Sequence, residues 1–426
     1  MKHIICTSIV LITLSCLSLS AQEHKRVFFI GNSYTYVNNL PQVLSNLATS
    51  FGDTVTHASS TPGGAQLVQH VTNTNTLNGI RQGNWDVVVI QEQSQKPSFS
   101  DAQVATDVYP YAAQLNDSIE YYNPCAETAF YMTWGRQNGD AQNCPFLPAL
   151  CTFDGMNARL RRAYLRMALD NEAIAAPVGA VWKMVRDSLP NINLYTSDGS
   201  HPSQAGTYLA ACTFYATLFR KGVTGSSYYG NVPVMDARQI QQLVDHVVLD
   251  SLSNWYIGAY DVQADFATTI NGNTISINNN SQRTSSYQWD FGDASPIDTN
   301  ANPNHTYTTT GTYILRLIAS DVCGKVDTSV QTITIATILN KSGPPSSKPD
   351  VEIYPNPSNG IFKVQCPSGI QELKIISMLG QELLQMENLE HSTQEIKLDG
   401  TDFEGIHYLY IKDQQGRESI EQLSVY

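Results

Sequence analysis

Short apolar runs alternate with helical patterns from Val27 to about Tyr256, and this alternation limits the fold more than any other feature. Residues 27–30, 86–90 and 128–134 are apolar runs typical of strands buried on both faces of a parallel sheet. Apolar residues at helical spacing predict helices over residues 41–51, 107–122 and 157–176. We therefore predict an α/β domain with three layers, α/β/α, around a parallel sheet.

The pattern changes near Tyr260. Residues 261–337 are short strands rich in Asn, Thr and Ser, and a second series of alternating strands runs to the end after a Pro/Ser/Lys-rich segment. This pattern predicts two small all-β sandwiches. The predicted organisation is a signal segment at 1–21, an α/β domain at 22–258, β-sandwiches at 260–337 and 351–426, and a linker at 338–350.

The N-terminus predicts export. Lys2 and His3 precede an apolar run over residues 4–19, and small residues end the segment before Gln22. The alternative is a lipoprotein signal lipidated at Cys16, although the residues before that cysteine fit such a signal poorly. No other apolar run is long enough to span a bilayer.

Six cysteines remain beyond the signal segment, and an exported protein meets an oxidising compartment. Cys144 and Cys151 flank a short loop and form the favoured disulfide pair. Cys212, in contrast, fits a small buried residue. No closely spaced cysteine pair of the zinc-binding kind is present, so no metal site is expected.

The charge balance excludes two classes of partner. The formal net charge is −13, the pI is near 5.1, and no basic cluster stands out. Neither nucleic acid nor an anionic membrane surface is an expected partner.

Three residues point to nucleophilic catalysis. Asp198 and His201 lie three residues apart in a Gly/Ser/Pro-rich turn, and Ser33 follows the first predicted strand in a Gly-Asn-Ser-Tyr-Thr sequence. A serine hydroxyl becomes a useful nucleophile when an imidazole takes its proton, and a carboxylate orients that imidazole. Ligands of parallel sheets bind at the carboxyl ends of the strands, where Ser33 is expected.

These motifs, with Gly63-Gly64 about thirty residues after the serine, resemble the SGNH/GDSL hydrolases over residues 24–256. The resemblance implies a flavodoxin-like fold and a serine esterase without metal or organic cofactor. It assigns Ser33 as nucleophile, His201 as general base and then acid, and Asp198 as the orienting carboxylate. It also implies an oxyanion hole formed by the backbone N–H groups of Ser33 and Gly64.

The chain departs from this family at the third donor of the oxyanion hole. The family has a Gly-x-Asn-Asp block after the central strand, where this chain has Gln91-Glu92-Gln93-Ser94-Gln95. Gln95 falls at the Asn position and Gln93 at the Gly position. A glutamine amide donates the same hydrogen bond from a side chain one methylene longer, and the sequence leaves open which glutamine faces the site.

Other residues are candidates for lining the substrate cleft. Trp134 and Arg136 follow the strand at 128–134 and are expected in the cleft wall, with structural packing as the alternative for Trp134. Glu92 either binds a polar substrate group or makes a buried structural hydrogen bond. His70, on a helical stretch after Gly64, is expected to pack or cap a helix.

The two β-segments carry motifs of their own. Residues 287–293 (YQWDFGD), with His305-Thr306-Tyr307, resemble the PKD type of immunoglobulin-like module, although Ala294 replaces a frequent Gly. Residues 353–362 (IYPNPSNGIF) and the later EGIHYLYIKD resemble the C-terminal sorting domain of the Bacteroidetes type IX secretion system. That resemblance implies contact with the secretion machinery and a secreted or cell-surface protein. The alternative is another adhesive β-module.

Together these features predict a secreted serine esterase acting on an extracellular ester, with acetylated glycan as the favoured substrate. A lipase or arylesterase on the same scaffold is one alternative. Another is a surface adhesin or glycan-binding protein whose hydrolase site is impaired by the altered glutamine block.

Overall fold

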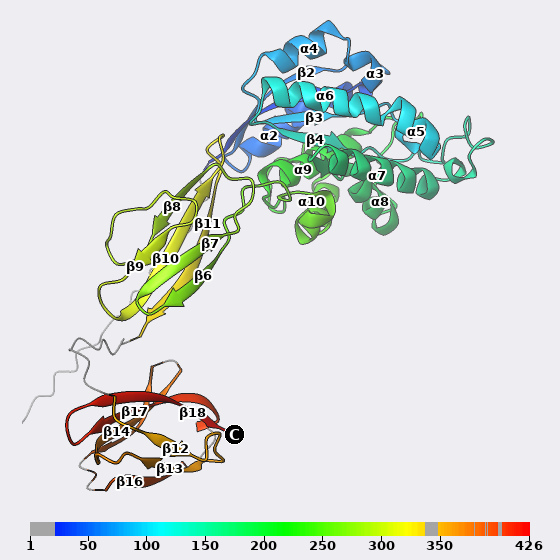
Figure 1. Cartoon of the computed structure of the whole chain (residues 1–426). Helices are drawn as coiled ribbons and strands as arrows, with labels where there is room; N and C mark the ends of the chain where they lie inside the picture. The colour runs from blue at the N-terminus through cyan, green and yellow to red at the C-terminus, as the bar shows by residue number, and fades with distance from the viewer. Residues whose placement is uncertain (1–21, 337–347, 379, 388, 390, 399–402) are drawn as a thin grey trace, which may run out of the picture. The chain divides into compact units, whose positions relative to one another are not determined.

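The computed structural model describes residues 22–336 and 348–426, apart from residues 379, 388, 390 and 399–402 (Figure 1). The predicted signal segment and most of the predicted linker lie outside the described residues. The chain divides into two compact units, one ending at Asp261 and the other covering Val262–Tyr426. Among the residues described, no helix is both long and apolar enough to cross a membrane.

The first unit contains a five-stranded, fully parallel sheet of strand order β2-β1-β3-β4-β5. This is the flavodoxin-like order, in which the strand order reverses beside β1. Every residue of β3 is buried, as expected for a strand covered on both faces. The strands are β1 His24–Ile30, β2 Thr54–Ser60, β3 Val87–Ile90, β4 Glu127–Tyr131 and β5 Ile174–Ala176.

Helices cover both faces of the sheet, which confirms the predicted three layers (Figure 1). α4, α6 and α7 form one layer, while α2, α8, α9 and α10 form the other. The α-helices are α1 Ser33–Tyr36, α2 Leu40–Thr49, α3 Leu67–His70, α4 Thr74–Arg81, α5 Asp101–Asp107, α6 Tyr109–Tyr122, α7 Phe153–Asp170, α8 Val178–Ser188, α9 Gln204–Phe219 and α10 Val234–Val248. Short 3₁₀ turns are η1 Val37–Asn39, η2 Lys96–Ser98, η3 Pro148–Cys151 and η4 Leu249–Trp255.

The predicted helix over residues 157–176 is wrong at its C-terminal end. α7 ends at Asp170, and Glu172 adopts a left-handed backbone conformation with φ 46°. The apolar residues that follow form β5, the edge strand beside β4. A short apolar run after a helix fits either a further helical turn or a buried strand, and periodicity alone does not separate the two.

α9 is the central support of the first unit. Its apolar residues surround the helix rather than forming one stripe, and nearly all of them are buried. A helix that is apolar all round belongs in a core. Because α9 begins three residues after His201, this rigid helix fixes the turn that carries Asp198 and His201.

The described residues include both disulfide-bonded and free cysteines. Cys144 and Cys151 form a disulfide, as predicted. Cys212 on α9 and Cys366 are free and buried.

The strands described in the second unit form antiparallel β-sheets, as predicted. Residues up to Ile335 form two three-stranded sheets around a core that includes Trp289 and Tyr307. Their strands are β6 Phe266–Asn271, β7 Thr274–Asn279 and β9 Asn304–Thr306 in one sheet, and β8 Ser286–Asp290, β10 Gly311–Ser320 and β11 Val326–Ile335 in the other.

Two further sheets follow and enclose a separate core that includes Phe362, Leu373 and Leu409. One consists of β12 Glu352–Tyr354, β13 Ile361–Gln365 and β16 Thr393–Lys397. The other consists of β14 Ile370–Ser377, β15 Glu382–Glu387, β17 Gly405–Asp413 and β18 Glu418–Val425.

Candidate active site

Ser33 lies at the carboxyl end of β1, in the turn that starts α1. Asn32 caps the helix by accepting a hydrogen bond from Tyr34 N at 3.1 Å. Gln91, the first residue after β3, accepts hydrogen bonds from Asn32 N and from the Thr35 hydroxyl through its Oε1, each at 3.0 Å. Because β1 and β3 are neighbours in the sheet, this glutamine clamps the turn that presents Ser33.

Gly31 leaves the space that Gln91 needs. A β-carbon at residue 31 would lie 2.6 Å from Gln91 Oε1 and 2.8 Å from Thr35 Oγ1. These separations are closer than van der Waals contact, so any larger residue would displace the clamp. The glycine of the Gly-Asn-Ser motif is therefore required by packing.

Gly31→Ala is expected to lower the free energy of unfolding by about 1–3 kcal/mol, the usual cost of overpacking a tight site. Gly63→Ala is the matched control, because a β-carbon there would meet Tyr36 Oη at 3.5 Å, an ordinary contact. Urea unfolding of both variants measures the difference. Equal stabilities would contradict the packing role assigned to Gly31.

A second turn, which leads into α9, carries Asp198 and His201. Asp198 Oδ1 accepts hydrogen bonds from Ser200 N and His201 N at 2.9 Å and from the Thr196 hydroxyl at 2.8 Å. Gly199 has φ +63°, a conformation that glycine adopts without strain. The Asp-Gly-Ser-His sequence is therefore a turn organised by the aspartate itself.

The two turns bring Ser33, His201 and Asp198 into one hydrogen-bonded chain. His201 Nε2 lies 2.9 Å from Ser33 Oγ, and His201 Nδ1 lies 2.5 Å from Asp198 Oδ2. The histidine and aspartate side chains are 34% and 47% exposed, so the chain is open to solvent and to a ligand. Three residues up to 168 positions apart thus have the geometry of a nucleophile, a base and an orienting carboxylate.

Asp198 is held in its ionised form. Partial burial raises the pKa of this carboxyl, but hydrogen bonds from His201, Ser200 and Thr196 outweigh that effect and hold the pKa well below its usual range. An ionised carboxylate at this position keeps a proton on Nδ1 of the imidazole and leaves Nε2 to accept a proton from Ser33.

Aromatic residues pack against the turns that carry this hydrogen-bonded chain. The ring of Tyr34 contacts the His201 ring edge-on at a centroid distance of 5.4 Å, and its hydroxyl lies 2.7 Å from Ser200 Oγ. Trp134 stacks between Tyr34 and Trp182 at centroid distances of 4.7 and 3.8 Å and donates a hydrogen bond to Ser200 O. Trp134 is fully buried, which favours the packing interpretation over a direct place in the cleft wall.

The two backbone N–H groups expected in the oxyanion hole are those of Ser33 and Gly64. Ser33 N and Gly64 N donate no hydrogen bond within the described part of the chain. Asn32 Nδ2 donates to Ala65 O at 2.9 Å, which holds the Gly63-Gly64 turn beside the serine. Gly64 is exposed and has φ +69°, so its amide lies on an open, glycine-specific turn.

The glutamine block makes hydrogen bonds both within itself and to neighbouring segments. Gln95 Nε2 donates to the buried Asp140 at 2.7 Å, and Gln93 Nε2 donates to Gln95 Oε1 at 3.2 Å. Ser94, between the two glutamines, lies beside the Tyr34 hydroxyl, which places the block beside α1. Each amide nitrogen carries a second hydrogen, so both glutamines stay candidates for a third donor.

Arg136 and Glu92 have different surroundings. Arg136 is partly exposed and pairs with Asp140 at 3.4 Å. Glu92 is fully buried, and its Oε1 accepts hydrogen bonds from Leu67 N at 3.2 Å and Gln93 N at 2.5 Å. Glu92 thereby ties the segment after Gly64 to the glutamine block and has no surface open to a substrate.

Burial raises the pKa of Glu92 to about 7. The folded protein therefore binds this proton more tightly than the unfolded chain, so its contribution to stability falls as pH rises from about 4.5 to about 7. We expect Glu92→Gln to remove this dependence, so that the stability of the variant relative to the natural protein rises by about 3 kcal/mol over that range. Urea unfolding at a series of pH values tests this, and a difference that does not change with pH would contradict it.

His70 is a supporting residue as well. The ring is buried between Gly31 O and the Thr76 hydroxyl, with Nε2 2.9 Å and Nδ1 2.8 Å from these oxygens. Burial lowers the pKa of His70, in keeping with a neutral ring that donates from Nε2 and accepts at Nδ1. No group of three or more His, Cys, Asp or Glu side chains suited to a metal occurs among the described residues.

Comparisons with known proteins bear on all three segments. Residues 260–336 match the family model of the PKD domain, and residues 352–425 match that of the secretion system C-terminal sorting domain, which confirms both resemblances. The sorting domain marks the chain for type IX secretion to the cell surface or the extracellular space. No curated protein matches the chain.

Solved structures resemble individual segments. A candidate SGNH hydrolase from Slackia heliotrinireducens is 30% identical over 46% of this chain and 99% of its own, with a TM-score of 0.38. A DUF4886 family protein from Bacteroides uniformis is 19% identical over 53% of this chain and 95% of its own, with a TM-score of 0.46. The PKD1 domain of the Vibrio cholerae metalloprotease PrtV is 33% identical over 18% of this chain and 99% of its own, with a TM-score of 0.18.

Proposed function

We propose that this secreted hydrolase is a serine esterase with Ser33 as its nucleophile. The premise is that the N-terminal domain belongs to the SGNH hydrolases. The observation that carries the proposal is the hydrogen-bonded chain from Ser33 Oγ to His201 to Asp198. A protein that only binds its ligand does not need an activated hydroxyl. This hydrogen-bonded chain therefore argues against an inactive adhesin.

In the acylation step, Ser33 Oγ attacks the ester carbonyl carbon while His201 Nε2 takes the serine proton. Asp198 stabilises the imidazolium through its hydrogen bond to Nδ1. The carbonyl oxygen becomes an oxyanion, which the N–H groups of Ser33 and Gly64 stabilise. His201 then gives its proton to the leaving alcohol as the tetrahedral intermediate collapses to an acyl-enzyme on Ser33.

Deacylation repeats the sequence with water. His201 takes a proton from the water molecule, whose oxygen attacks the acyl carbon, and the same two N–H groups stabilise the second oxyanion. When the intermediate collapses, the proton returns from His201 to Ser33 Oγ and the carboxylic acid leaves. No step requires a group beyond these residues and water.

The substrate that we propose is an O-acetyl ester on an extracellular glycan. Export by the type IX system carries the enzyme to the cell surface or the extracellular space, and the polar residues Gln93 and Gln95 follow β3, the strand that pairs with β1, which leads to Ser33. This assignment predicts activity toward short acyl groups on a polar alcohol.

A substrate series tests this assignment with the mature full-length chain. We expect hydrolysis of p-nitrophenyl acetate to exceed that of the octanoate ester, together with acetate release from acetylated xylan. Faster hydrolysis of the octanoate ester and of emulsified triglyceride would instead identify a lipase. An arylesterase would hydrolyse the p-nitrophenyl esters and release no acetate from glycan.

A further inference from the structure

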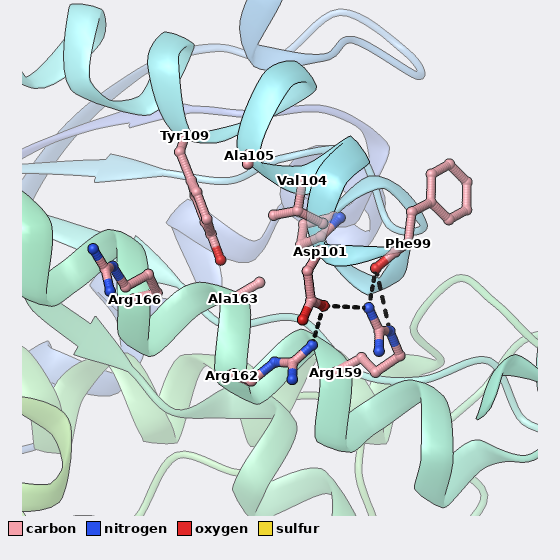
Figure 2. A pocket seen from close by; sticks show the side chains of 10 residues that line it. Phe99, Asp101, Val104, Ala105, Tyr109, Arg159, Arg162, Ala163 and Arg166 are labelled. Atoms are coloured by element: carbon pink, nitrogen blue, oxygen red, sulfur yellow. Dashed lines mark hydrogen bonds and ion pairs between the residues drawn. The ribbon is translucent and has the colours of Figure 1, made fainter. Parts of the chain in front are cut away.

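A groove lies apart from the hydrogen-bonded chain of Ser33, between α5, the start of α6 and α7 (Figure 2). Its volume is about 430 Å³, within the range of small-molecule sites. The buried side chains of Val104 and Ala163 contribute to its lining. Tyr109 extends from the start of α6 toward Ala163 and presents a half-buried aromatic ring (Figure 2).

Three arginines of α7 line the groove. Arg159, Arg162 and Arg166 are three and four positions apart, so they lie on successive turns of one helix face. Asp101 at the start of α5 pairs with Arg159 at 2.8 Å and also with Arg162 (Figure 2). Arg159 further donates to the carbonyl oxygens of Ser98 and Phe99, which fixes the segment before α5 against α7.

The arginines keep donors for a ligand. Among the described residues, the hydrogen bonds of Arg162 and Arg166 each use one nitrogen of the guanidinium, to Asp101 and Asp170 respectively. Each guanidinium has five N–H donors, so most of them face solvent. The side chains of Arg162 and Arg166 are both 60% exposed.

The groove is positive on a negative protein. Its lining has three arginines and one aspartate, and Asp170 pairs with Arg166 beside it, which leaves one net positive charge on a chain whose net charge is −13. An anionic ligand therefore fits its charge. The planar guanidinium fork matches a carboxylate, and the half-buried ring of Tyr109 offers a flat apolar face next to it. A carboxylate attached to a ring, as in a uronic acid, uses both features, whereas a free inorganic anion uses only the first.

The groove shares a segment with the candidate active site. η2 follows directly after Gln95, and Ser98 binds Gln95 O through both its N, at 2.9 Å, and its hydroxyl, at 2.6 Å. Ser94, in the same block, contacts Tyr34 beside Ser33. The glutamine block therefore connects the turn that carries Ser33 to the wall of the groove.

We propose that this groove, with Arg162, Arg166 and Tyr109, binds a uronic acid unit of the polymer whose acetyl groups Ser33 removes. This substrate class, an acidic acetylated glycan, rests on the proposed function. Binding of the uronate itself requires no catalysis, so it is measured separately from turnover.

Calorimetric titration of the full-length Ser33→Ala protein tests the groove. Trigalacturonate is expected to bind, more weakly as salt rises, and neutral xylotriose is expected to bind at least tenfold more weakly. Replacing Arg162 and Arg166 together by Gln is expected to weaken trigalacturonate binding by about tenfold or more. Arg161→Gln is the matched control on the same helix, because Arg161 lies over the Trp255 ring and not in the groove, and it should leave the affinity unchanged.

Several outcomes would overturn this proposal. Equal binding of the acidic and neutral trisaccharides would show that charge does not determine binding. Equal losses of affinity in Arg161→Gln and the double variant would show that the ligand does not bind in the groove. Sulfate binding as tightly as trigalacturonate would indicate a simple anion site without a sugar. Because Ser33→Ala is used throughout, each result stands whether or not the natural protein hydrolyses p-nitrophenyl acetate, which tests the esterase separately.

Discussion

Replacing Ser33 with alanine is expected to lower kcat for p-nitrophenyl acetate by at least about 10⁴-fold, because the nucleophile of the acylation step is lost. The turn should survive, since its hydrogen bonds are made by Asn32, Thr35 and Gln91 and not by the Ser33 hydroxyl. Residual hydrolysis would reflect substrate binding and the backbone N–H groups alone.

Ser45→Ala is a suitable control for this experiment. Ser45 lies on α2, where its hydroxyl donates to Val55 O at 3.0 Å, outside the candidate site. Its activity should stay within about twofold of the natural protein, because the change removes one partly buried hydrogen bond away from the candidate site, about 1 kcal/mol of stability. A Ser33→Ala protein that keeps a tenth or more of the natural activity would contradict the assignment of the nucleophile.

Asp198→Asn is expected to lower kcat by about 10³–10⁴-fold with little change in fold. The asparagine oxygen is needed by three donors, namely Ser200 N, His201 N and the Thr196 hydroxyl. The amide NH₂ therefore takes the place of Oδ2 and faces His201 Nδ1. An amide donor there favours a proton on Nε2, which is the wrong tautomer for accepting the proton of Ser33.

Steady-state kinetics of Asp198→Asn and Thr196→Val separate catalysis from support of the turn. Thr196→Val removes one hydrogen bond to Asp198 Oδ1 and leaves the contact with His201 intact. Its loss should be about tenfold or less, the equivalent of one hydrogen bond. If the two variants lose similar activity, the carboxylate acts only by holding the turn.

Much of the fold follows from local sequence pattern. The buried run of β3 and the helical spacing of α2 and α6 predict their elements within a few residues. The end of α7 could not be predicted, because the apolar residues of β5 fit a further helical turn until their pairing with β4 is known. Strand pairing depends on residues far apart in sequence, which local periodicity does not include.

The candidate site, like the fold, contains residues that local sequence predicts and residues that depend on distant partners. Ser33, Asp198 and His201 stand in turns whose chemistry is local, so the sequence indicates them. The sequence does not predict Gln91 as a support, and it predicts a packing role for His70 without its partner Gly31, because these partners in the Gly31–Thr35 turn are 39 to 59 residues away. The one sequence signal is the position of Gln91, which directly follows a strand that pairs with β1.

Burial decided the other assignments. Their places after β4 and β3 leave Trp134 and Glu92 between a place in the cleft wall and a buried structural role, and both are fully buried, which favours the structural role. Sequence order places a residue at the end of a strand, but it does not show whether the neighbouring loops cover it. Here the stacking of Tyr34 and Trp182 covers the tryptophan.

Direct detection of the acyl-enzyme tests the central claim. The mature protein would be mixed with p-nitrophenyl acetate, quenched with acid during turnover, digested and analysed by mass spectrometry. We predict one added acetyl group on the peptide that contains Ser33, and none on that peptide in Ser33→Ala. Continued release of nitrophenol with no acetyl group on Ser33, or with an acetyl group that turns over on another residue, would contradict the account.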